Sequence, residues 1–398
     1  MSSSNSVSVA YVDEATYGVT PTPAGSVTLN KIRFTSESLS GTPITVESDV
    51  IRTDRMSSGQ LVTGLEVGGE IPFELSRDSF FDKFLGLAMM NDWTLATSDV
   101  SSVDFTIDSG DNQRGDLAGT GVGTGISVGD ILRVTDGSTD HIFQVITVTD
   151  ADNLVVACKK DTASFTGATS RRPPYVEVGK TQASVTLTKA YEDVFSTGTD
   201  EQSQTYSGAI VSGFNLSIPW GEKVTGSFTY MANGYKLESP SYQQQIVTES
   251  GTVNEAPTSL PLTAVDLPLA TADGVATEFC IETMDITLDN GMTPQNCLGS
   301  VAAKRFELGQ AGFNITMSVY LGDQSYEQFQ PKKISQTRMS MTVALHKDGG
   351  GYAIVFPSLQ FSFSDPAAQG ANQSVMYELT GVASIAADGT SLPRIYQI

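Results

Sequence analysis

The amino-acid sequence of 398 residues predicts an all-β protein built from two related modules, each with one short flanking helix. Threonine, serine, valine and glycine dominate the composition, and only 17% of the residues are charged, which is typical of β-rich globular proteins. Runs of alternating apolar and polar residues recur along the chain, and this period of two indicates strands with one buried face. The same strand-turn-helix pattern also occurs twice.

The two copies of this pattern lie at residues 69–84 and 312–329. In each copy, a glycine opens an alternating run that ends at an aspartate, Asp78 or Asp323, suited to cap a helix. The apolar positions of the two runs are Ile71, Phe73 and Leu75, and Phe313, Ile315, Met317, Val319 and Leu321. The aromatic residues that follow are expected to anchor each helix to the core, and they are Phe80, Phe81 and Phe84, and Tyr326 and Phe329.

The first module is predicted to begin in residues 1–96, with a strand at 32–39 before the repeated unit. Between these, the polar stretch 40–62 lacks periodicity and predicts a long loop or a protruding hairpin. Residues 97–172 then become rich in glycine, aspartate, serine and threonine, with turn signals between four short β patterns. We expect them to form a small inserted β-barrel that faces outward. The four patterns lie at 103–107, 131–134, 142–148 and 154–158.

The pattern of the first module resumes at 173–250, a polar proline-containing stretch at 251–262 is a predicted linker, and residues 263–398 form the second module. Its expected strands are 279–288, 313–321, 339–345, 352–356, 359–363 and 375–379. The aperiodic stretch 289–308 holds the place that 40–62 holds in the first copy. This shared order of strand, long loop, strand and helix indicates a duplication.

The formal net charge of −22 excludes ordinary binding to nucleic acids and anionic membranes, because the surface repels phosphate groups. Neither a signal peptide nor a membrane span is recognisable, so folding in a cytoplasm is expected. Three cysteines, Cys158, Cys280 and Cys297, are too few for a disulfide framework and are predicted to be buried free thiols.

No catalytic, cofactor or metal site is predicted. The two histidines, His141 and His346, have no partners arranged for a triad or a metal site. The glycine-rich stretch 119–125 completes neither a dinucleotide nor a phosphate-binding motif. A calcium loop starting at Asp108 would need glutamate where Gly119 stands. Paired carboxylates of a glycosidase remain an open alternative, since acidic residues are numerous.

Acidic residues are regularly placed on two predicted strands. Alternation in residues 65–75 sends Glu66, Glu70 and Glu74 to the face opposite the apolar side chains, and Asp285 and Asp289 share the polar face of the strand at 279–288. A plain solvated sheet face explains this pattern. In a closed ring of several subunits, however, the same strands would form a strongly negative inner wall.

Several segments resemble the tail tube (major tail) proteins of long-tailed bacteriophages, the siphoviruses. The resemblance spans most of the chain, although its motifs are loose and none is catalytic. The segments are 10–21 (AYVDEATYGVTP), 32–39 (IRFTSESL), 49–55 (DVIRTDR), 68–75 (GGEIPFEL), 189–191 (KAY), 213–218 (GFNLSI), 224–231 (VTGSFTYM) and 351–361 (GYAIVFPSLQF).

The resemblance implies β-sandwich modules whose sheets join around a ring and line a lumen. The protein would be a virion tail component that assembles in the host cytoplasm, with itself, a tape measure protein and tail terminator or baseplate proteins as partners, and with no cofactor. Double-stranded DNA would pass through the lumen during ejection. Two modules in one chain predict a trimeric, pseudo-hexameric ring.

Under this resemblance, Glu66, Glu70, Glu74, Asp285 and Asp289 are lumen-lining candidates. The loop residues Asp49, Arg52, Asp54 and Arg55 are candidates for contacts between stacked rings, and the stretch 289–308 is expected to have the same role in the second copy. The alternatives are a distal tail or baseplate ring protein, which forms a single ring, and a tail-associated protein that binds or cleaves polysaccharide.

Overall fold

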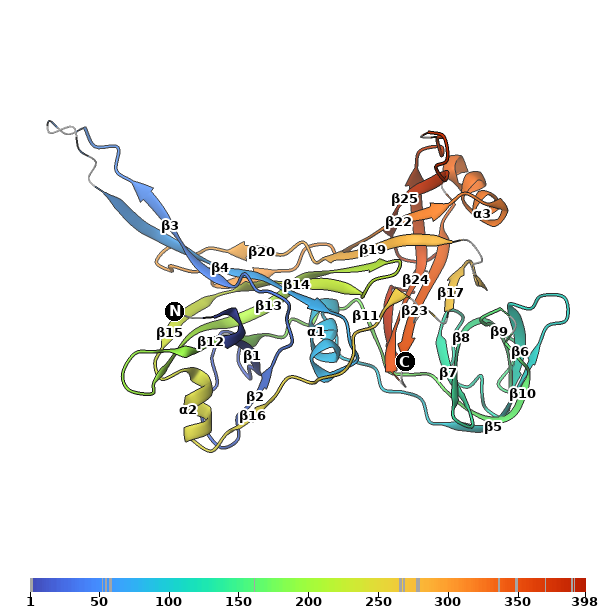
Figure 1. The fold of residues 1–398 in the computed structure, drawn as a ribbon, viewed down its shortest axis with the longest axis horizontal. Coiled ribbons are helices and arrows are strands. Elements are labelled where there is room, and N and C mark those ends of the chain that lie inside the picture. The colour runs from blue at the N-terminus through green and yellow to red at the C-terminus, as the bar shows by residue number, and fades with distance from the viewer. Residues whose placement is uncertain are drawn as a thin grey trace.

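The computed structural model describes residues 3–398 except 52, 54, 55, 57, 58, 161, 265, 266, 268, 277–279, 336, 348, 349, 369, 388 and 390. It confirms the all-β fold, because most of the described chain lies in strands that form extended sheets and one closed barrel (Figure 1). Up to residue 96 the elements are η1 (Ser4–Ser6), β1 (Val7–Asp13), β2 (Thr28–Lys31), β3 (Ser40–Glu47), β4 (Gln60–Glu74) and α1 (Ser79–Met89).

The middle of the chain contains the elements β5 (Val100–Ile107), β6 (Arg114–Ala118), β7 (Ile131–Asp136), β8 (Thr139–Val148), β9 (Asn153–Ala157), β10 (Phe165–Arg171), β11 (Tyr175–Glu177), β12 (Val185–Phe195), β13 (Glu201–Pro219), β14 (Thr225–Ala232), β15 (Gly234–Glu238), α2 (Tyr242–Thr248) and β16 (Thr252–Asn254). The last part contains β17 (Leu269–Ala272), β18 (Val275–Ala276), β19 (Ile281–Asp289), β20 (Thr293–Gln295), β21 (Arg305–Glu307), β22 (Gly312–Tyr320), α3 (Asp323–Ser335), β23 (Met339–Lys347), β24 (Gly350–Phe363), β25 (Met376–Ala383) and β26 (Arg394–Gln397).

One layer of the fold is a run of eight strands in the order β3-β4-β14-β13-β19-β22-β25-β24, in which all neighbours are antiparallel. The C-terminal half of β13 pairs with β19 from Gly213 opposite Asp289 to Pro219 opposite Thr283. This pairing joins strands from the first part of the chain to strands from the last part. We call the eight strands the long sheet.

A second layer covers one face of the long sheet (Figure 1). On one side it consists of β2, β1, β12, β15 and the N-terminal half of β13, and on the other of β17, β23, β26, β11 and the N-terminal half of β24. Because β13 and β24 pass from one layer to the other, 18 strands are hydrogen-bonded into a single sheet.

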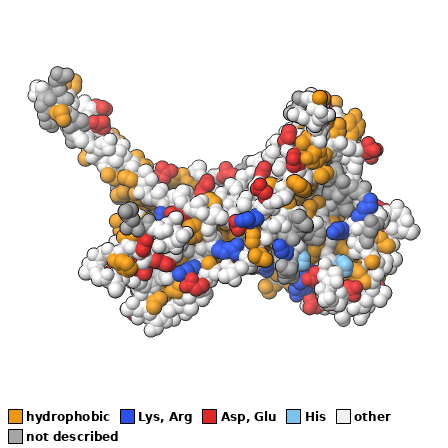
Figure 2. All heavy atoms as spheres, in the orientation of Figure 1, with side chains coloured by type: hydrophobic (Ala, Val, Ile, Leu, Met, Phe, Trp, Pro, Cys, Tyr) orange, Lys and Arg blue, Asp and Glu red, His pale blue; other side chains and the backbone are white. Residues whose placement is uncertain are grey.

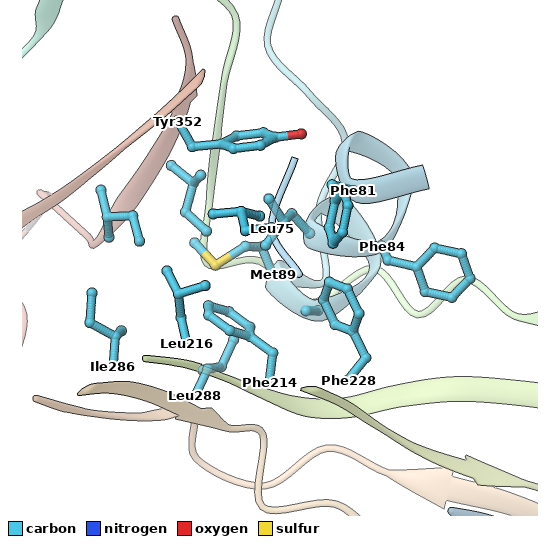
Figure 3. Packing of buried hydrophobic residues seen from close by; sticks show 14 of the residues in the cluster. Leu75, Phe81, Phe84, Met89, Phe214, Leu216, Phe228, Ile286, Leu288 and Tyr352 are labelled. Carbon is cyan, nitrogen blue, oxygen red and sulfur yellow. The ribbon is translucent and has the colours of Figure 1, made fainter. Parts of the chain in front are cut away.

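Helix α1 fills the space between the layers. The Asp78 carboxylate caps it by accepting hydrogen bonds from the backbone N–H groups of Phe80 (2.9 Å) and Phe81 (3.2 Å), as the sequence predicts. Phe80, Phe81 and Phe84 are buried, which confirms their predicted role as anchors. Figure 3 shows Phe81 and Phe84 facing Phe228 of β14, and Phe214 and Leu216 of β13 beside Ile286 and Leu288 of β19. The core is therefore continuous across the β13–β19 joint.

Helix α3 occupies the equivalent place in the last part of the chain but is poorly covered. Phe329 is buried as predicted, whereas the Tyr326 side chain is 54% exposed, so its prediction as an anchor is wrong. The prediction of Asp323 as the cap is also wrong, because it is the first residue of the helix itself. The order β4-α1-β12-β13-β14 is nevertheless repeated as β22-α3-β23-β24-β25, with corresponding strand pairs.

Strands β5 to β10 form a closed barrel in the order β10-β5-β6-β9-β8-β7. The sequence predicted only four of its strands, since β6 and β10 lack regular apolar alternation. Phe105 and Phe143 stack inside it with ring centroids 4.8 Å apart. The chain leaves the first part and returns to it at one place, because Thr94 and Tyr175 exchange backbone hydrogen bonds of 2.7 and 3.1 Å.

The barrel packs against strands from the last part of the chain. Asp130, at the start of β7, is fully buried, and its carboxylate accepts hydrogen bonds from Arg394 Nη1 (2.9 Å) and the Tyr396 hydroxyl (2.8 Å). The Thr271 hydroxyl of β17 also donates to Gln144 Oε1 of β8. Burial and the Asp130 carboxylate raise the pKa of Tyr396, which keeps its hydroxyl as the donor.

Residues 40–62 include the hairpin of β3 and β4, which projects far from the body of the molecule (Figure 1). The stretch 289–308 folds back along the base of this hairpin, where the Leu65 backbone N–H donates to the carbonyl of Val301 (2.7 Å). It is not wholly irregular as predicted, because β20 and β21 pair within it.

The three cysteines are free thiols, and only Cys158 is buried. The prediction is therefore wrong for Cys280 and Cys297, which are exposed: Cys280 lies directly before β19 and Cys297 between β20 and β21. The general preference of cysteine for interiors does not account for these local positions.

The Asp130→Ala substitution is expected to lower the free energy of unfolding by about 3 kcal/mol, because it leaves the Arg394 guanidinium and the Tyr396 hydroxyl without their buried acceptor. Denaturant unfolding of the unassembled protein measures this loss. Asp116→Ala, which removes an exposed carboxylate of the same barrel, is the control and is expected to change stability by less than about 0.5 kcal/mol. A loss below about 1 kcal/mol for Asp130→Ala would contradict the anchoring role.

Alkylation of the native, unassembled protein at pH 8 is expected to modify Cys280 and Cys297 but not Cys158. Burial raises the pKa of the Cys158 thiol to about 11, so only about one molecule in a thousand carries the reactive thiolate at that pH. Peptide mass spectrometry after iodoacetamide treatment identifies the modified residues, and unfolding in denaturant should expose the third. Rapid modification of Cys158 under native conditions would show that its pocket opens.

Candidate functional surface

The face of the long sheet turned away from the core carries mainly small polar side chains. Strand register defines one row across it, in which Glu74, Thr225, Ser217, Asp285, Thr316, Thr380 and Ser362 lie side by side on successive strands from β4 to β24. The row is continuous across the β13–β19 joint. Side chains on either side of each of these residues point to the opposite face, where most are buried.

Two neighbouring rows repeat this composition. One contains Ser227, Asn215, Thr287 and Asn314, and the Asn215 amide bonds both the Ser227 hydroxyl (3.0 Å) and its backbone N–H (2.9 Å). The other places Glu70, Thr229, Gly213, Asp289 and Gly312 next to one another. The polar groups of the three rows are therefore arranged regularly across the sheet.

All five acidic residues singled out in the sequence lie on this face. Glu66, Glu70, Asp285 and Asp289 are exposed, and Glu74 is half-buried and forms an ion pair with Lys223. The structure thus brings together carboxylates from β4 and β19, which are far apart in the sequence. We call this surface, defined by the three rows and Glu66, the acidic face.

Glu378, which was not among the residues predicted from the sequence, also lies on the acidic face. It is opposite Ser318 in the β22–β25 pair and accepts a 2.8 Å hydrogen bond from the Ser318 hydroxyl. The buried neighbours Tyr377 and Leu379 give the signal that could have identified it, since the residue between them must point outward.

The loop candidates are only partly described. Asp49 is exposed beyond the end of β3, whereas Arg52, Asp54 and Arg55 lie outside the described residues. The projecting hairpin also carries exposed apolar side chains, which are visible along it in Figure 2. With their exposed fractions, they are Ile44 (50%), Val46 (54%), Val50 (70%), Ile51 (97%), Leu61 (67%) and Val62 (63%).

A hollow of 430 Å³ lies beside the base of this hairpin. Residues of β3, β4 and β14 line it together with the 289–308 stretch, including Thr42, Glu66, Met231 and Phe306. Its ionisable lining residues are Glu66 and Tyr230, and burial raises the pKa of Tyr230 well above its usual value, so these two groups do not form an acid-base pair suited to catalysis near neutral pH.

In the part of the chain that the structure describes, little indicates a catalytic site, a metal site or a membrane span. His141 stacks on Phe165, with ring centroids 4.8 Å apart, and burial lowers its pKa. No group of three or more histidine, cysteine or acidic side chains there is placed to hold a metal ion. None of the helices in this part is long and apolar enough to cross a bilayer.

Comparison with known proteins agrees with a structural role. A search of curated proteins finds no match to the chain. A family model described as "Phage tail tube protein" matches residues 4–383, which include both parts of the long sheet and the barrel between them. Members of this family are structural components of the virion tail rather than enzymes, and they assemble into a tube. Because the match covers nearly the whole sequence, this chain belongs to the phage tail tube protein family.

Proposed function

We propose that three copies of the chain close into a ring, that rings stack into a tube, and that the acidic face lines its lumen. The observation that carries the proposal is the β13–β19 joint, which already unites two strand-helix units into one curved sheet with a single polar face. Closure of three such sheets into a barrel would remove both sheet edges, which are otherwise prone to unspecific pairing.

The two units of this proposal are residues 1–96 with 173–250, and residues 263–398, joined by the linker 251–262. Their repeated order of strand, helix and three strands supports treating them as equivalent tube domains. Three chains then supply six such domains, so the ring would be trimeric in chains and pseudo-hexameric in domains. The inserted domain 97–172 lies away from the acidic face, so it would form the outer surface of the tube.

The composition of the acidic face supports the passage of double-stranded DNA. Glu66, Glu70, Glu74, Asp285 and Asp289 would repel phosphates, and their potential extends about 10 Å at 0.1 M salt. The neutral serine, threonine and asparagine side chains between them offer hydrogen bonds but no positive charge to hold the backbone. DNA would therefore slide during ejection, and a tape measure protein would occupy the lumen before it.

Contacts between rings are assigned to the projecting hairpin and to the 289–308 stretch at the same end of the long sheet. The candidates in the first segment are Asp49 together with Arg52, Asp54 and Arg55, which lie outside the described residues. The exposed apolar side chains of the hairpin support this role, because they would be covered by the next ring. Tail terminator and baseplate proteins would cover the two end rings. Assembly would take place in the host cytoplasm, and the finished tube belongs to a siphovirus tail.

Negative-stain electron microscopy of the purified protein across a concentration series tests the proposal. Hollow tubes with an axial repeat and three-fold end views are expected, because each chain contributes two units. Single rings that never stack would favour the distal tail or baseplate alternative instead. Persistent monomers would contradict a ring-forming role, and saturable cleavage of a polysaccharide would support the remaining alternative.

Reversing the charge of the acidic face is expected to make tubes retain DNA. The variant carries Glu66→Lys, Glu70→Lys, Asp285→Lys and Asp289→Lys, and it is assembled with short duplex DNA before the tubes are sedimented. Wild-type tubes should retain none, whereas variant tubes should retain DNA at low salt and release it as salt rises.

A matched control reverses four exposed acidic residues that lie off this face, Asp92, Asp108, Asp116 and Glu249. It receives the same change in net charge, so equal retention by the control would show that the acidic face does not line the lumen.

A further inference from the structure

The long sheet ends differently at its two sides. At one end, residues 35–40 run beside β4, where the backbone N–H of Thr35 donates to Pro72 (2.9 Å) and that of Ser38 to Glu70 (3.0 Å). At the other end, the C-terminal part of β24 pairs with β25 from Leu359 to Phe363. Among the described residues, no strand pairs with residues 361–363 on the side away from β25.

The β13–β19 joint inside the chain is a template for the contact between chains, and this inference rests on the proposed ring. Matching the buried residues Ile71, Phe73 and Leu75 of β4 with Ile315, Met317 and Val319 of β22 makes Gly68 equivalent to Gly312. The same shift makes Asp78, the cap of α1, equivalent to Gly322, the residue directly before α3. Two independent features therefore give one alignment of the two units.

With this alignment, each residue of the β13–β19 pair can be matched with a residue at one of the two ends of the long sheet. Asp289 lies opposite Gly312, as Ser40 lies opposite Gly68, so Ser40 takes the place of Asp289. On the other side of the joint, Gly213 of β13 lies opposite Thr229 of β14, which in turn lies opposite Glu70 of β4.

In the same way, Gln360 of β24 lies opposite Val382 of β25, which in turn lies opposite Asn314 of β22. Because Glu70 and Asn314 are equivalent under the alignment, Gln360 takes the place of Gly213. The internal pair of Gly213 with Asp289 therefore becomes Gln360 with Ser40.

We propose that the C-terminal part of β24 pairs antiparallel with residues 38–40 of the next copy, with Gln360 opposite Ser40 and Ser362 opposite Ser38. Such pairing adds a strand to a sheet edge through backbone hydrogen bonds. At Leu39 these bonds would replace the one that its N–H donates to Glu37 Oε2 (3.0 Å) and the one that its carbonyl accepts from the Tyr206 hydroxyl (3.0 Å). The side chains at the new joint would be small and polar, which continues the acidic face without a break.

The different coverage of helices α1 and α3 independently supports the same pairing between chains. Within the chain, the last part covers α1: the Tyr352 hydroxyl donates to Asp82 (2.8 Å), and the Asn290 amide donates to the carbonyl of Ala88 (2.9 Å). The equivalent helix α3 has no such cover, since Tyr326 is 54% and Ile334 is 92% exposed. Hydrophobic side chains around α3 are visible in Figure 2.

Within the chain, the start of β24 lies beside α1. In the proposed contact between chains, the start of β13 of the next copy would lie beside α3 in the equivalent position. The β12–β13 hairpin would then lie against α3. It carries the exposed residues Glu192, Asp193 and Phe195, whereas the last turn of α3 carries Lys332 and Lys333. Lys332, Lys333 and Glu192 already form ion pairs within the chain. Both surfaces nevertheless offer exposed apolar groups to bury, Phe195 on the hairpin and Ile334 on the helix.

Disulfide cross-linking of assembled tubes tests the register. Ser40→Cys and Gln360→Cys are combined in a background of Cys280→Ser and Cys297→Ser, which removes the exposed native thiols. Opposed residues of antiparallel strands have Cα atoms about 4.5–5.5 Å apart, within the range that a disulfide spans. Mild oxidation should therefore convert most chains into covalent dimers and trimers on a non-reducing gel.

The matched control combines Thr45→Cys with Gln360→Cys, because Thr45 is exposed on β3 but lies about 16 Å further along the strand. It should remain monomeric on the gel. A positive control, Asn215→Cys with Thr287→Cys, bridges the internal joint and should leave the chain mass unchanged. Equal cross-linking of the Thr45 pair, or none of the Ser40 pair in intact tubes, would overturn the proposed register and leave the proposed function standing.

Hydrogen exchange of the unmodified protein provides a second measurement that does not depend on the variants. Amides of Phe361 and Phe363, which face away from β25, should exchange at least tenfold more slowly in tubes than in unassembled protein, whereas those of Thr35 and Ser38 already donate within the chain and should change little. Unchanged exchange in tubes would overturn the proposed joint. Failure of the unmodified protein to form rings or tubes would instead contradict the proposed function itself.

Discussion

The pairing of β13 with β19 is the interaction on which the rest of the structure depends. It connects strands that belong to separate parts of the chain, and each backbone hydrogen bond in it satisfies groups that would otherwise form two open edges. Because the register is antiparallel and regular, apolar side chains such as Leu216 and Ile286 meet on one face and polar ones on the other. The shared core and the shared polar face are therefore two results of one strand pair.

The two faces of the long sheet have opposite requirements. The inner face needs close packing, which the aromatic cluster around Phe81, Phe84 and Phe228 supplies. Under the proposed function, the face turned away from the core needs groups that do not hold a polyanion, and it carries many small hydroxyl and amide side chains. A sheet can meet both needs in the same seven or eight residues of strand, because successive side chains point in opposite directions. A helix of equal length would present a much narrower polar stripe.

The sequence predicted those features that depend on local patterns. Alternation identified β4 and β22, and Asp78 was recognised as a cap because it interacts with residues only two and three positions away. Features that depend on distant contacts were missed. Tyr326 was expected to anchor its helix in the core, but within the described part of the chain its side chain is 54% exposed.

Strand β6 was overlooked for a related reason, since it is held mainly by its neighbours β5 and β9 rather than by its own pattern. The acidic candidates on β4 and β19 were identified strand by strand. That they share one face follows from register, which alternation alone does not determine. The place of Thr94 beside Tyr175 likewise depends on a contact across 81 positions of the chain, which no local pattern encodes.

The close approach of Thr94 and Tyr175 makes the barrel an exchangeable part. A foreign domain with equally close termini can replace residues between them without lengthening any connection, so tubes of the proposed architecture would display a chosen protein at regular spacing. The graft must meet one chemical condition. Arg394, Tyr396 and Thr271 lose their buried partners with the barrel, and a replacement must supply an acceptor in the position of Asp130 or be combined with apolar substitutions at these three positions.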